Sequence, residues 1–383
     1  MSALPSELPD PTAHARATRP ADTRRRSRPR TDFVLPPGLE ATQPPQERGL
    51  ARDQVRLLVA GPGGGTQLTR FAELARFLAP ADLVVINTSA TLNAALDGET
   101  RGRPVAVHVC AVPPAEQAVE LRRHHGHGPV TDAAPGDVVT LPGGVRLRLL
   151  TGYPDATVAR GSRLWRAAWT LPPAVPSVAD LLATHGRPIR YGHLRSHPPL
   201  AAYQTIYADR PGSAEAASAG RPFSGRVLAR LAARGVAVAP IVLHAGVSSP
   251  EAGEPPLAER YAVPASTARA VNQTRAHGGR VVAVGTTVVR ALESAARPGG
   301  HVVQAGGWTE LVLGPDRPVR VVDGLITGWH EPGASHLLLL EAVAGPHLVA
   351  QAYREALAAR LLWHEFGDSC LLLPRRTFRA AVA

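Results

Sequence analysis

The sequence contains very little cysteine and no long apolar run, and both absences narrow the classes of protein to which it can belong. Its two cysteines, Cys110 and Cys370, lie far apart in the 383 residues and match no spacing of metal ligands. So little cysteine is typical of a reducing compartment, and we expect a cytoplasmic protein with no bound metal. No stretch reaches the about 18 apolar residues of a membrane span, and the N-terminus lacks the apolar segment of a secretory signal.

Lysine is also absent, so arginine supplies the whole positive charge. All 42 basic positions are arginine, and against 31 acidic residues they give a formal net charge of +11. Residues 1–30 alone hold seven arginines against Glu7, Asp10 and Asp22. Such charge favours a polyanionic partner such as nucleic acid, because arginines neutralise phosphates. The remaining +7 fits a solvated basic surface as well as an RNA-binding face, and both interpretations stay open.

Composition and hydrophobic pattern divide the chain into four segments, and its length is sufficient for two domains with hydrophobic cores. Residues 1–45 are rich in proline and arginine, which predicts a disordered tail. Residues 96–184 contain short alternating segments separated by glycine and proline, which predict an inserted antiparallel β-barrel domain. In residues 46–95 and 185–383 strand and helix patterns alternate, which predicts an α/β domain with mainly parallel strands, built as a layer or a barrel.

The individual elements follow from the same patterns. Strands are expected at 55–59, 83–87, 105–112, 137–141, 145–150, 156–160, 164–170, 237–244, 281–284, 319–326 and 369–373. Helices are expected at 71–78, 223–234, 265–277, 288–296, from Ser335, and at 349–363.

The most informative stretch is residues 281–293. A β-branched run, Val281–Val284, is closed by Gly285-Thr286-Thr287, and a helical pattern follows. This predicts a buried strand, a tight turn and a helix whose first turn is capped by the threonine hydroxyls. The free N–H groups of such a turn suit an anion or a ribose hydroxyl, and Arg290 is expected to reach the same pocket. The structural interpretation of Glu293 is an ion pair with Arg290 on the same helix.

Two histidines follow expected strands and are candidates for chemistry. His244 ends the strand 237–244, and His330 lies in the loop after the strand 319–326. A lone histidine near a core is usually a packing residue, whereas two at strand ends on one rim also suit binding or proton transfer. Both interpretations stay open. Glu259 and Asp368 are the acidic candidates.

Tyr203 and Gln204 form a further candidate site. Side by side they offer ring stacking and paired amide hydrogen bonds, which suit a heterocyclic base. The small residues at 212–220 let a ligand approach the backbone. An ordinary flexible loop is the alternative interpretation.

Taken in order, these segments resemble the S-adenosylmethionine:tRNA ribosyltransferase-isomerase family of queuosine biosynthesis. The matching signatures are Arg52-Asp53 with Arg56–Leu58, Leu83–Asn87, Tyr203–Ala208, Gly212-Ser213, Ala219-Gly220 with Phe223, Leu243-His244 with Gly246, Glu259 with Tyr261, Val284–Glu293, Leu325–Thr327 with His330 and Pro332, and Phe366–Asp368. They run across most of the chain, and the stretch 281–293 together with the terminal Phe-Gly-Asp is specific.

The resemblance implies both a fold and a reaction. The fold is α/β, a barrel-like α/β domain with an inserted antiparallel β-barrel domain. The enzyme moves the ribosyl part of S-adenosylmethionine onto the aminomethyl-deazaguanine (preQ1) of a tRNA anticodon stem-loop. The ribose isomerises, epoxyqueuosine-tRNA forms, and adenine and methionine leave. S-adenosylmethionine is then a substrate and no prosthetic group is expected; we expect the chain to act as a monomer.

The resemblance also implies roles for single residues. His330 or His244 is expected to remove the proton beside the sulfonium, while Glu259 or Asp368 holds the amine or the sulfonium. Arg290, Thr286 and Thr287 are expected to position ribose or carboxylate oxygens. The other expected substrate-binding residues are Tyr203, Gln204, Thr205, Gly220, Phe223, Gly246, Gly285, Thr327 and Pro332.

Several positions depart from the family pattern. Thr88 and Ala90 replace an acid and an arginine, and a second family arginine becomes Ala95. A family histidine becomes Pro222, and Glu331 places a charge in a formerly apolar loop. Losing one side of a charge network is costly unless its partners change too. Two alternatives therefore stay open: a diverged enzyme that uses another acceptor, and a noncatalytic RNA- or nucleoside-binding homologue.

Overall fold

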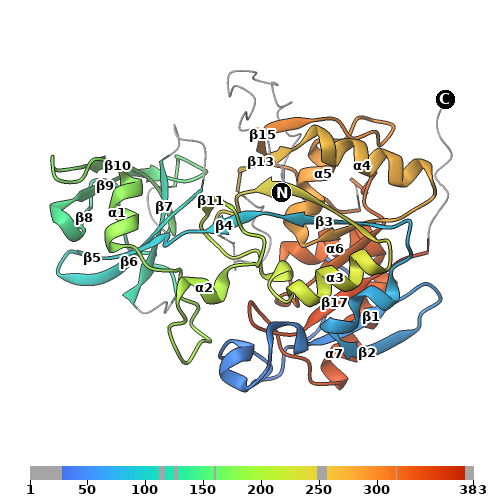
Figure 1. Cartoon of the computed structure of the whole chain (residues 1–383). Helices are drawn as coiled ribbons and strands as arrows, with labels where there is room; N and C mark the ends of the chain where they lie inside the picture. The colour runs from blue at the N-terminus through green and yellow to red at the C-terminus, as the bar shows by residue number, and fades with distance from the viewer. Residues whose placement is uncertain are drawn as a thin grey trace.

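The computed structural model describes residues 28–111, 117–124, 128–158, 161–247, 257–315 and 317–375. Two parts lie side by side, a mixed α/β part and a smaller all-β part (Figure 1). Most of the tail predicted at 1–45 lies outside the described residues. None of the helices described here has both the length and the apolarity needed to cross a bilayer.

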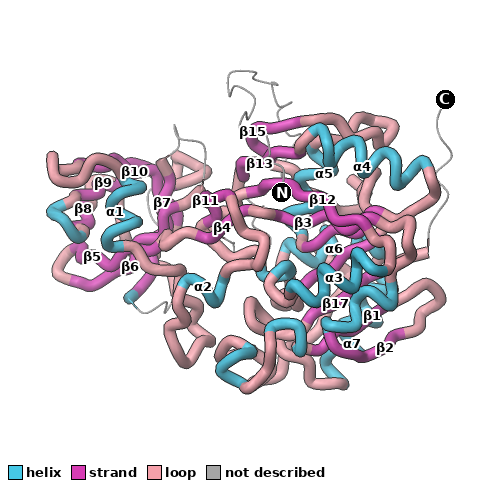
Figure 2. The backbone as a smooth tube through the Cα atoms, in the orientation of Figure 1, coloured by secondary structure: helices cyan, strands magenta, loops and turns pink. Residues whose placement is uncertain are grey.

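A nine-stranded mixed sheet forms the centre of the α/β part (Figure 2). In order across the sheet, its strands are β15 (Ala305–Thr309), β13 (Glu259–Val263), β12 (Ala237–Leu243), β3 (Leu83–Asn87), β14 (Val281–Val284), β16 (Gly324–Thr327), β17 (Ser369–Leu372), β1 (Arg56–Ala60) and β2 (Thr66–Arg70). The central strands β12, β3, β14 and β16 are parallel, whereas β17 runs antiparallel to β16. Because β15 and β2 are its two edges in the described pairing, the expected barrel-like form of this part is not confirmed.

Helices cover both faces of this sheet. They are α3 (Gly225–Ala233), α4 (Ala265–Ala276), α5 (Thr286–Ser294), α6 (Ser335–Ala344) and α7 (Pro346–Ala358), with the 3-10 helices η1 (Pro45–Arg48), η2 (Arg52–Gln54), η3 (Phe71–Phe77) and η6 (Ser218–Gly220). One core gathers the apolar sides of α4 to α7, and a second lies under η3 and α3. Burial on both faces explains why the central strands are continuous apolar runs.

Six antiparallel strands close into the barrel of the all-β part, in the order β10-β7-β6-β5-β8-β9. They are β5 (Ala95–Thr100), β6 (Arg103–Val109), β7 (Ala118–Arg123), β8 (Val138–Thr140), β9 (Arg146–Gly152) and β10 (Leu164–Thr170), with η5 (Pro142–Gly144) and α1 (Val178–His185) alongside. Its interior is a separate apolar core around Trp165. The short parallel pair β4 (Ser89–Thr91) and β11 (Arg210–Ser213) lies between the two parts. The short helix α2 (Leu200–Tyr203) lies near this pair.

Several expected elements are corrected. Helix α5 begins at Thr286 rather than at 288, and Gly285 is its N-cap, so no threonine hydroxyl caps it. In the strand expected at 156–160, residues 156–158 form bends and turns, and 159–160 lie outside the described residues. Helix α7 ends at Ala358, short of the expected 363, because the chain turns there to bring Trp363 into the core.

Residues 28–45 are also more ordered than a disordered tail. The backbone N–H of Thr31 donates to the Glu341 carboxylate at 2.7 Å. The Phe33 ring packs on Tyr353, with 4.9 Å between the ring centroids, and Glu40 forms a β-bridge with Trp363. This segment is therefore fixed to the C-terminal half of the chain.

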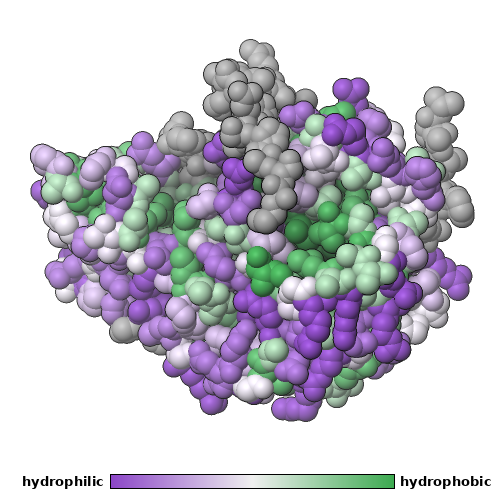
Figure 3. All heavy atoms as spheres, in the orientation of Figure 1, coloured by the Kyte–Doolittle hydropathy of each residue, from purple (hydrophilic) through white to green (hydrophobic). Residues whose placement is uncertain are grey.

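Most arginines of the described residues lie at least partly at the surface. On the face shown in Figure 3, hydrophobic residues gather over the middle of the α/β part, and hydrophilic residues dominate the lower rim. Within the described part of the chain, the buried arginines are Arg163, Arg221 and Arg290. Most of the basic charge is thus available to solvent or to a partner.

Candidate functional site

A cavity of about 380 Å³ lies between the barrel and the carboxyl ends of the parallel strands. The loops after β12, β14 and β16 line one side, and the barrel strands β6 and β7 supply His108, Glu120 and Arg122 on the other. Ligands of open α/β sheets bind outside the carboxyl ends of the strands, where helix N-termini and loops converge. The cavity therefore lies at the strand ends where the sequence analysis expects the site.

The N-terminus of α5 opens into this cavity. Gly285 has φ 86° and ψ 158°, a conformation that only glycine adopts readily, and no side chain caps the helix. Asn87 Nδ2 lies 3.3 Å from the Thr287 hydroxyl, which orients that side chain at the cavity wall. The uncapped N–H groups of Thr286 and Thr287 form a site for an oxygen with negative charge.

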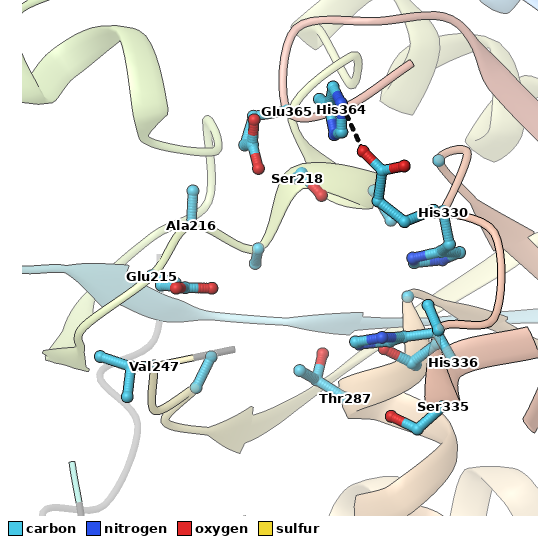
Figure 4. A pocket seen from close by; sticks show the side chains of 18 of the residues that line it. Glu215, Ala216, Ser218, Val247, Thr287, His330, Ser335, His336, His364 and Glu365 are labelled. Carbon is cyan, nitrogen blue, oxygen red and sulfur yellow. Dashed lines mark ion pairs between the residues drawn. The ribbon is translucent and has the colours of Figure 1, made fainter. Parts of the chain in front are cut away.

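Two stacked imidazoles, those of His330 and His336, form part of the wall (Figure 4). Their ring centroids are 4.6 Å apart and their planes differ by 5°. Burial lowers the pKa of His330 well below its ordinary value and that of His336 to about 4, so both rings are neutral at pH 7. The Thr327 hydroxyl lies 3.0 Å from His330 Nε2 and fixes the ring. His330 therefore has a lower pKa than the near-neutral value expected of a general base.

His336 is a site residue that the sequence analysis missed. It stands in the first turn of α6, a mostly apolar helix, which predicts burial rather than a role at a cavity. Its one signal in the sequence was its short distance from His330. The loop after a strand and the first turn of the next helix lie at the same edge of the sheet, so the two histidines could be expected near each other.

Arg290 and Glu259 form a buried ion pair that lines the cavity. Arg290 also donates to the carbonyl oxygens of Leu311 at 3.0 Å and Thr309 at 3.1 Å, and Glu259 accepts from Gly246 N at 3.0 Å. Burial lowers the pKa of Arg290 to about 10, at which it is still charged at neutral pH. These contacts hold β13, β15 and α5 together.

The ion pair predicted between Arg290 and Glu293 is wrong. The Glu293 carboxylate instead accepts hydrogen bonds from the backbone N–H groups of Arg320, Val321 and Val322, at 2.8 to 3.2 Å. It fixes the chain that leads into β16, and Arg290 pairs with Glu259 instead.

The barrel contributes a buried charged group that was not predicted. Glu120 contacts His108 Nδ1 at 2.9 Å, Arg163 Nη1 at 2.6 Å and Arg122 Nη1 at 3.1 Å. Burial alone would raise the pKa of Glu120, but these three partners bring it down to about 2. Arg122 is the most exposed of them and gives this side of the cavity wall a positive charge.

The structure brings seven of the predicted site residues to the cavity and places the others elsewhere. The lining includes Glu259, Gly285, Thr286, Thr287, Arg290, Thr327 and His330. The predicted residues outside the lining are Tyr203, Gln204, Thr205, Gly220, Phe223, His244, Gly246, Pro332 and Asp368.

The contacts of these outlying residues explain their positions. The His244 ring is pressed against Gly212, and its Nδ1 lies 2.8 Å from the Ser89 hydroxyl. The Gln204 amide bonds to both backbone groups of Thr91, at 3.0 and 2.8 Å, so it is not free to hold a base.

Asp368 and Tyr203 are also engaged in contacts away from the cavity. The Asp368 carboxylate forms an ion pair with Arg56 at 2.7 Å. Tyr203 packs on Phe366 in a small core, with 5.1 Å between the ring centroids. Both side chains stabilise the fold beside the cavity rather than its wall.

Comparison with known proteins identifies the family. The family model described as queuosine biosynthesis protein matches residues 29–372. The chain belongs to this family. It is 38% identical to the S-adenosylmethionine:tRNA ribosyltransferase-isomerase of Anaeromyxobacter dehalogenans (strain 2CP-C) over 356 residues, which cover 90% of this chain and 98% of the relative. The enzyme of the same name from Thermus thermophilus is 36% identical over 355 residues, or 89% and 98% of the two chains. A crystal structure of S-adenosylmethionine tRNA ribosyltransferase from Thermotoga maritima covers 90% of this chain and 99% of its own, with 27% identity and a TM-score of 0.48.

The departures from the family pattern occupy different places. Thr88 and Ala90 belong to the connection that carries β4, and Ala95 begins the barrel. Pro222 is buried in the α/β part, and nothing in its surroundings explains the replacement of a histidine. Glu331 lines the cavity and forms an ion pair with His364, 3.1 Å away. Of the five, it is therefore the departure that changes the cavity wall.

Proposed function

We propose that the cavity binds S-adenosylmethionine and that the enzyme transfers and isomerises its ribosyl moiety onto the preQ1 base of tRNA. The products are epoxyqueuosine-tRNA, adenine and methionine. The observation that carries this proposal is that a neutral imidazole, His330, and the open N-terminus of α5 share one cavity of about 380 Å³. That volume lies within the range of about 300–1,000 Å³ of small-molecule sites. Membership of the queuosine family supports the same reaction.

His330 is the proposed general base. Its low pKa keeps it unprotonated at neutral pH, and the Thr327 hydroxyl at Nε2 holds its ring in one orientation. The carbon beside the sulfonium loses its proton to this imidazole. The protonated ring is poorly solvated, so it returns the proton readily to a departing group.

Different residues of the cavity wall suit the positive and the negative groups of S-adenosylmethionine. The first turn of α5, with Thr286 and Thr287, is proposed to bind ribose or carboxylate oxygens. Glu215 also lines the cavity (Figure 4) and is proposed to bind the ammonium or sulfonium group. Glu259 is proposed to act through Arg290, because both of its oxygens are already engaged.

The proposed second substrate is the anticodon stem-loop of tRNA, bound by a monomer in the cytoplasm. The formal net charge of +11 supports a polyanionic partner. The barrel supports it as well, because its strands β6 and β7 form the outer wall of the cavity, with Arg122 in its lining.

Single-turnover ribosyl transfer tests the role of His330. We expect His330→Ala to slow transfer by about 10²- to 10⁴-fold, as loss of a general base does, with the Kd of S-adenosylmethionine changed only a few-fold. His277→Ala is the matched control, because His277 lies at the exposed end of α4. An unchanged rate in His330→Ala removes this residue from the chemistry.

A different acceptor is the second candidate function, and Glu331 favours it. This carboxylate faces the cavity where the family pattern has an apolar side chain. Adenine release with a panel of acceptors, including preQ1-tRNA, separates the possibilities. Release with another acceptor alone supports the second function, and no release with any acceptor indicates a noncatalytic homologue.

A further inference from the structure

Two imidazoles and three carboxylates converge at one edge of the cavity. Glu40 belongs to the N-terminal segment, His193 to the loop after α1, Glu331 to the loop after β16, and His364 and Glu365 to the loop before β17. One ligand atom each from Glu40, His193 and His364 lies within 4.8 Å of the other two. Four segments that are far apart in the sequence thus bring potential metal ligands to one point.

The contacts inside this cluster are short. His364 Nε2 lies 3.3 Å from Glu40 Oε1 and 3.1 Å from Glu331 Oε1, and His193 Nε2 lies 3.2 Å from Glu365 Oε2. The two imidazoles stack with 4.3 Å between their centroids. The side chains of His193, His364 and Glu365 are only 10%, 14% and 18% exposed, so water solvates them poorly.

The cluster contains more carboxylates than imidazoles. Within the described residues, the ion pairs of Glu40, Glu331 and Glu365 are all made to the two imidazoles. The buried Arg221, whose charge acts on Glu365, is the further cation beside them. Mixed imidazole and carboxylate ligands are those preferred by zinc and its first-row neighbours.

We propose that this cluster binds one divalent transition-metal ion through His193, His364 and Glu40, with Glu331 within reach as a fourth ligand. Glu365 remains the partner that orients His193. Each ligating imidazole must point a ring nitrogen at the ion, which two parallel stacked rings cannot both do. Binding therefore rotates the rings out of their stack. Because His193, Glu331 and His364 line the cavity, the ion faces the bound substrate.

Metal binding by the full-length protein tests this proposal without either substrate, so its result is independent of the proposed ribosyl transfer. The chelator-treated protein is dialysed against Zn²⁺ and the bound metal is counted by mass spectrometry. We expect one ion per chain that is lost in His364→Gln and His193→Gln, with affinity reduced more than the 10- to 100-fold typical of an outer-shell partner. His277→Gln is the control, and it should bind like the unsubstituted chain.

Two further measurements keep the result interpretable if a histidine variant folds poorly. Glu40→Gln alters a half-exposed side chain at the edge of the cluster, and it should weaken Zn²⁺ binding while circular dichroism stays unchanged. Co²⁺ in place of Zn²⁺ should give visible absorption bands of a site with nitrogen ligands, absent from both histidine variants. A chain that binds no ion, or variants that bind as tightly as the control, overturn the proposal.

Discussion

Replacing Arg290 by methionine should destabilise the α/β part strongly. Arg290 is 6% exposed, pairs with Glu259, and donates to the carbonyl oxygens of Leu311 and Thr309. Arg290→Met keeps a long side chain but leaves a carboxylate and three carbonyl groups, those of Leu311, Thr309 and Leu257, without their donor. Removing one partner of a buried pair costs about 3–5 kcal/mol, because the remaining charge stays desolvated.

The paired substitution separates charge burial from packing. In Arg290→Met/Glu259→Met no charge is left behind, and such apolar replacements of buried pairs are often nearly neutral. We therefore expect the free energy of unfolding of the double variant to exceed that of Arg290→Met alone by at least about 2 kcal/mol. Glu259→Met alone should fall between them, because three carbonyl groups still solvate the guanidinium.

Urea denaturation measures these differences. Far-UV circular dichroism follows unfolding, and hydrogen exchange of the peptides that contain α5 and β15 locates the weakened region. A cost below about 1 kcal/mol for Arg290→Met, or a double variant whose cost equals the sum of the singles, would refute the assignment of a coupled buried pair.

Two more predictions concern the barrel and the α5 turn. Because the pKa of Glu120 lies at about 2 in the folded chain, below its ordinary value of 4.5, the ionised carboxylate stabilises the fold above pH 4.5. That contribution, about 3 kcal/mol, is lost as the pH falls from 4.5 to 2. Urea titrations across this range should show the loss in the unsubstituted chain, and an equal loss in Glu120→Gln would contradict it. Gly285→Ala forces alanine into φ 86°, at about 1–3 kcal/mol, and should weaken S-adenosylmethionine binding in calorimetry. Gly299→Ala, in open space with an ordinary φ, is the control.

The buried strands were predictable because their signal is local. Strands β3 and β14 lie at the predicted residues, since strands covered on both faces must be apolar throughout. Strands β13 and β15 were missed. Their sequences, Glu259–Val263 and Ala305–Thr309, contain charged residues and glycines, and only pairing at the sheet edge makes them strands.

The candidate site shows the same difference between features with a local sequence signal and features that depend on long-range packing. Loops after β14 and β16 were predicted to meet, because parallel strands end at one edge of a sheet, and His330 and Thr286 do share a cavity. The barrel wall could not be predicted, since His108 and Glu120 reach the cavity only through the placement of one part against the other. The direction of the His244 ring also depends on a distant partner, Ser89.

The cavity has one wall from each of two bodies, and each body has its own apolar interior. Substitutions inside the barrel can therefore reshape one half of the binding surface without repacking the sheet that carries His330. Sequence change in one body can in this way alter one wall of the cavity while the opposite wall keeps its residues and their packing.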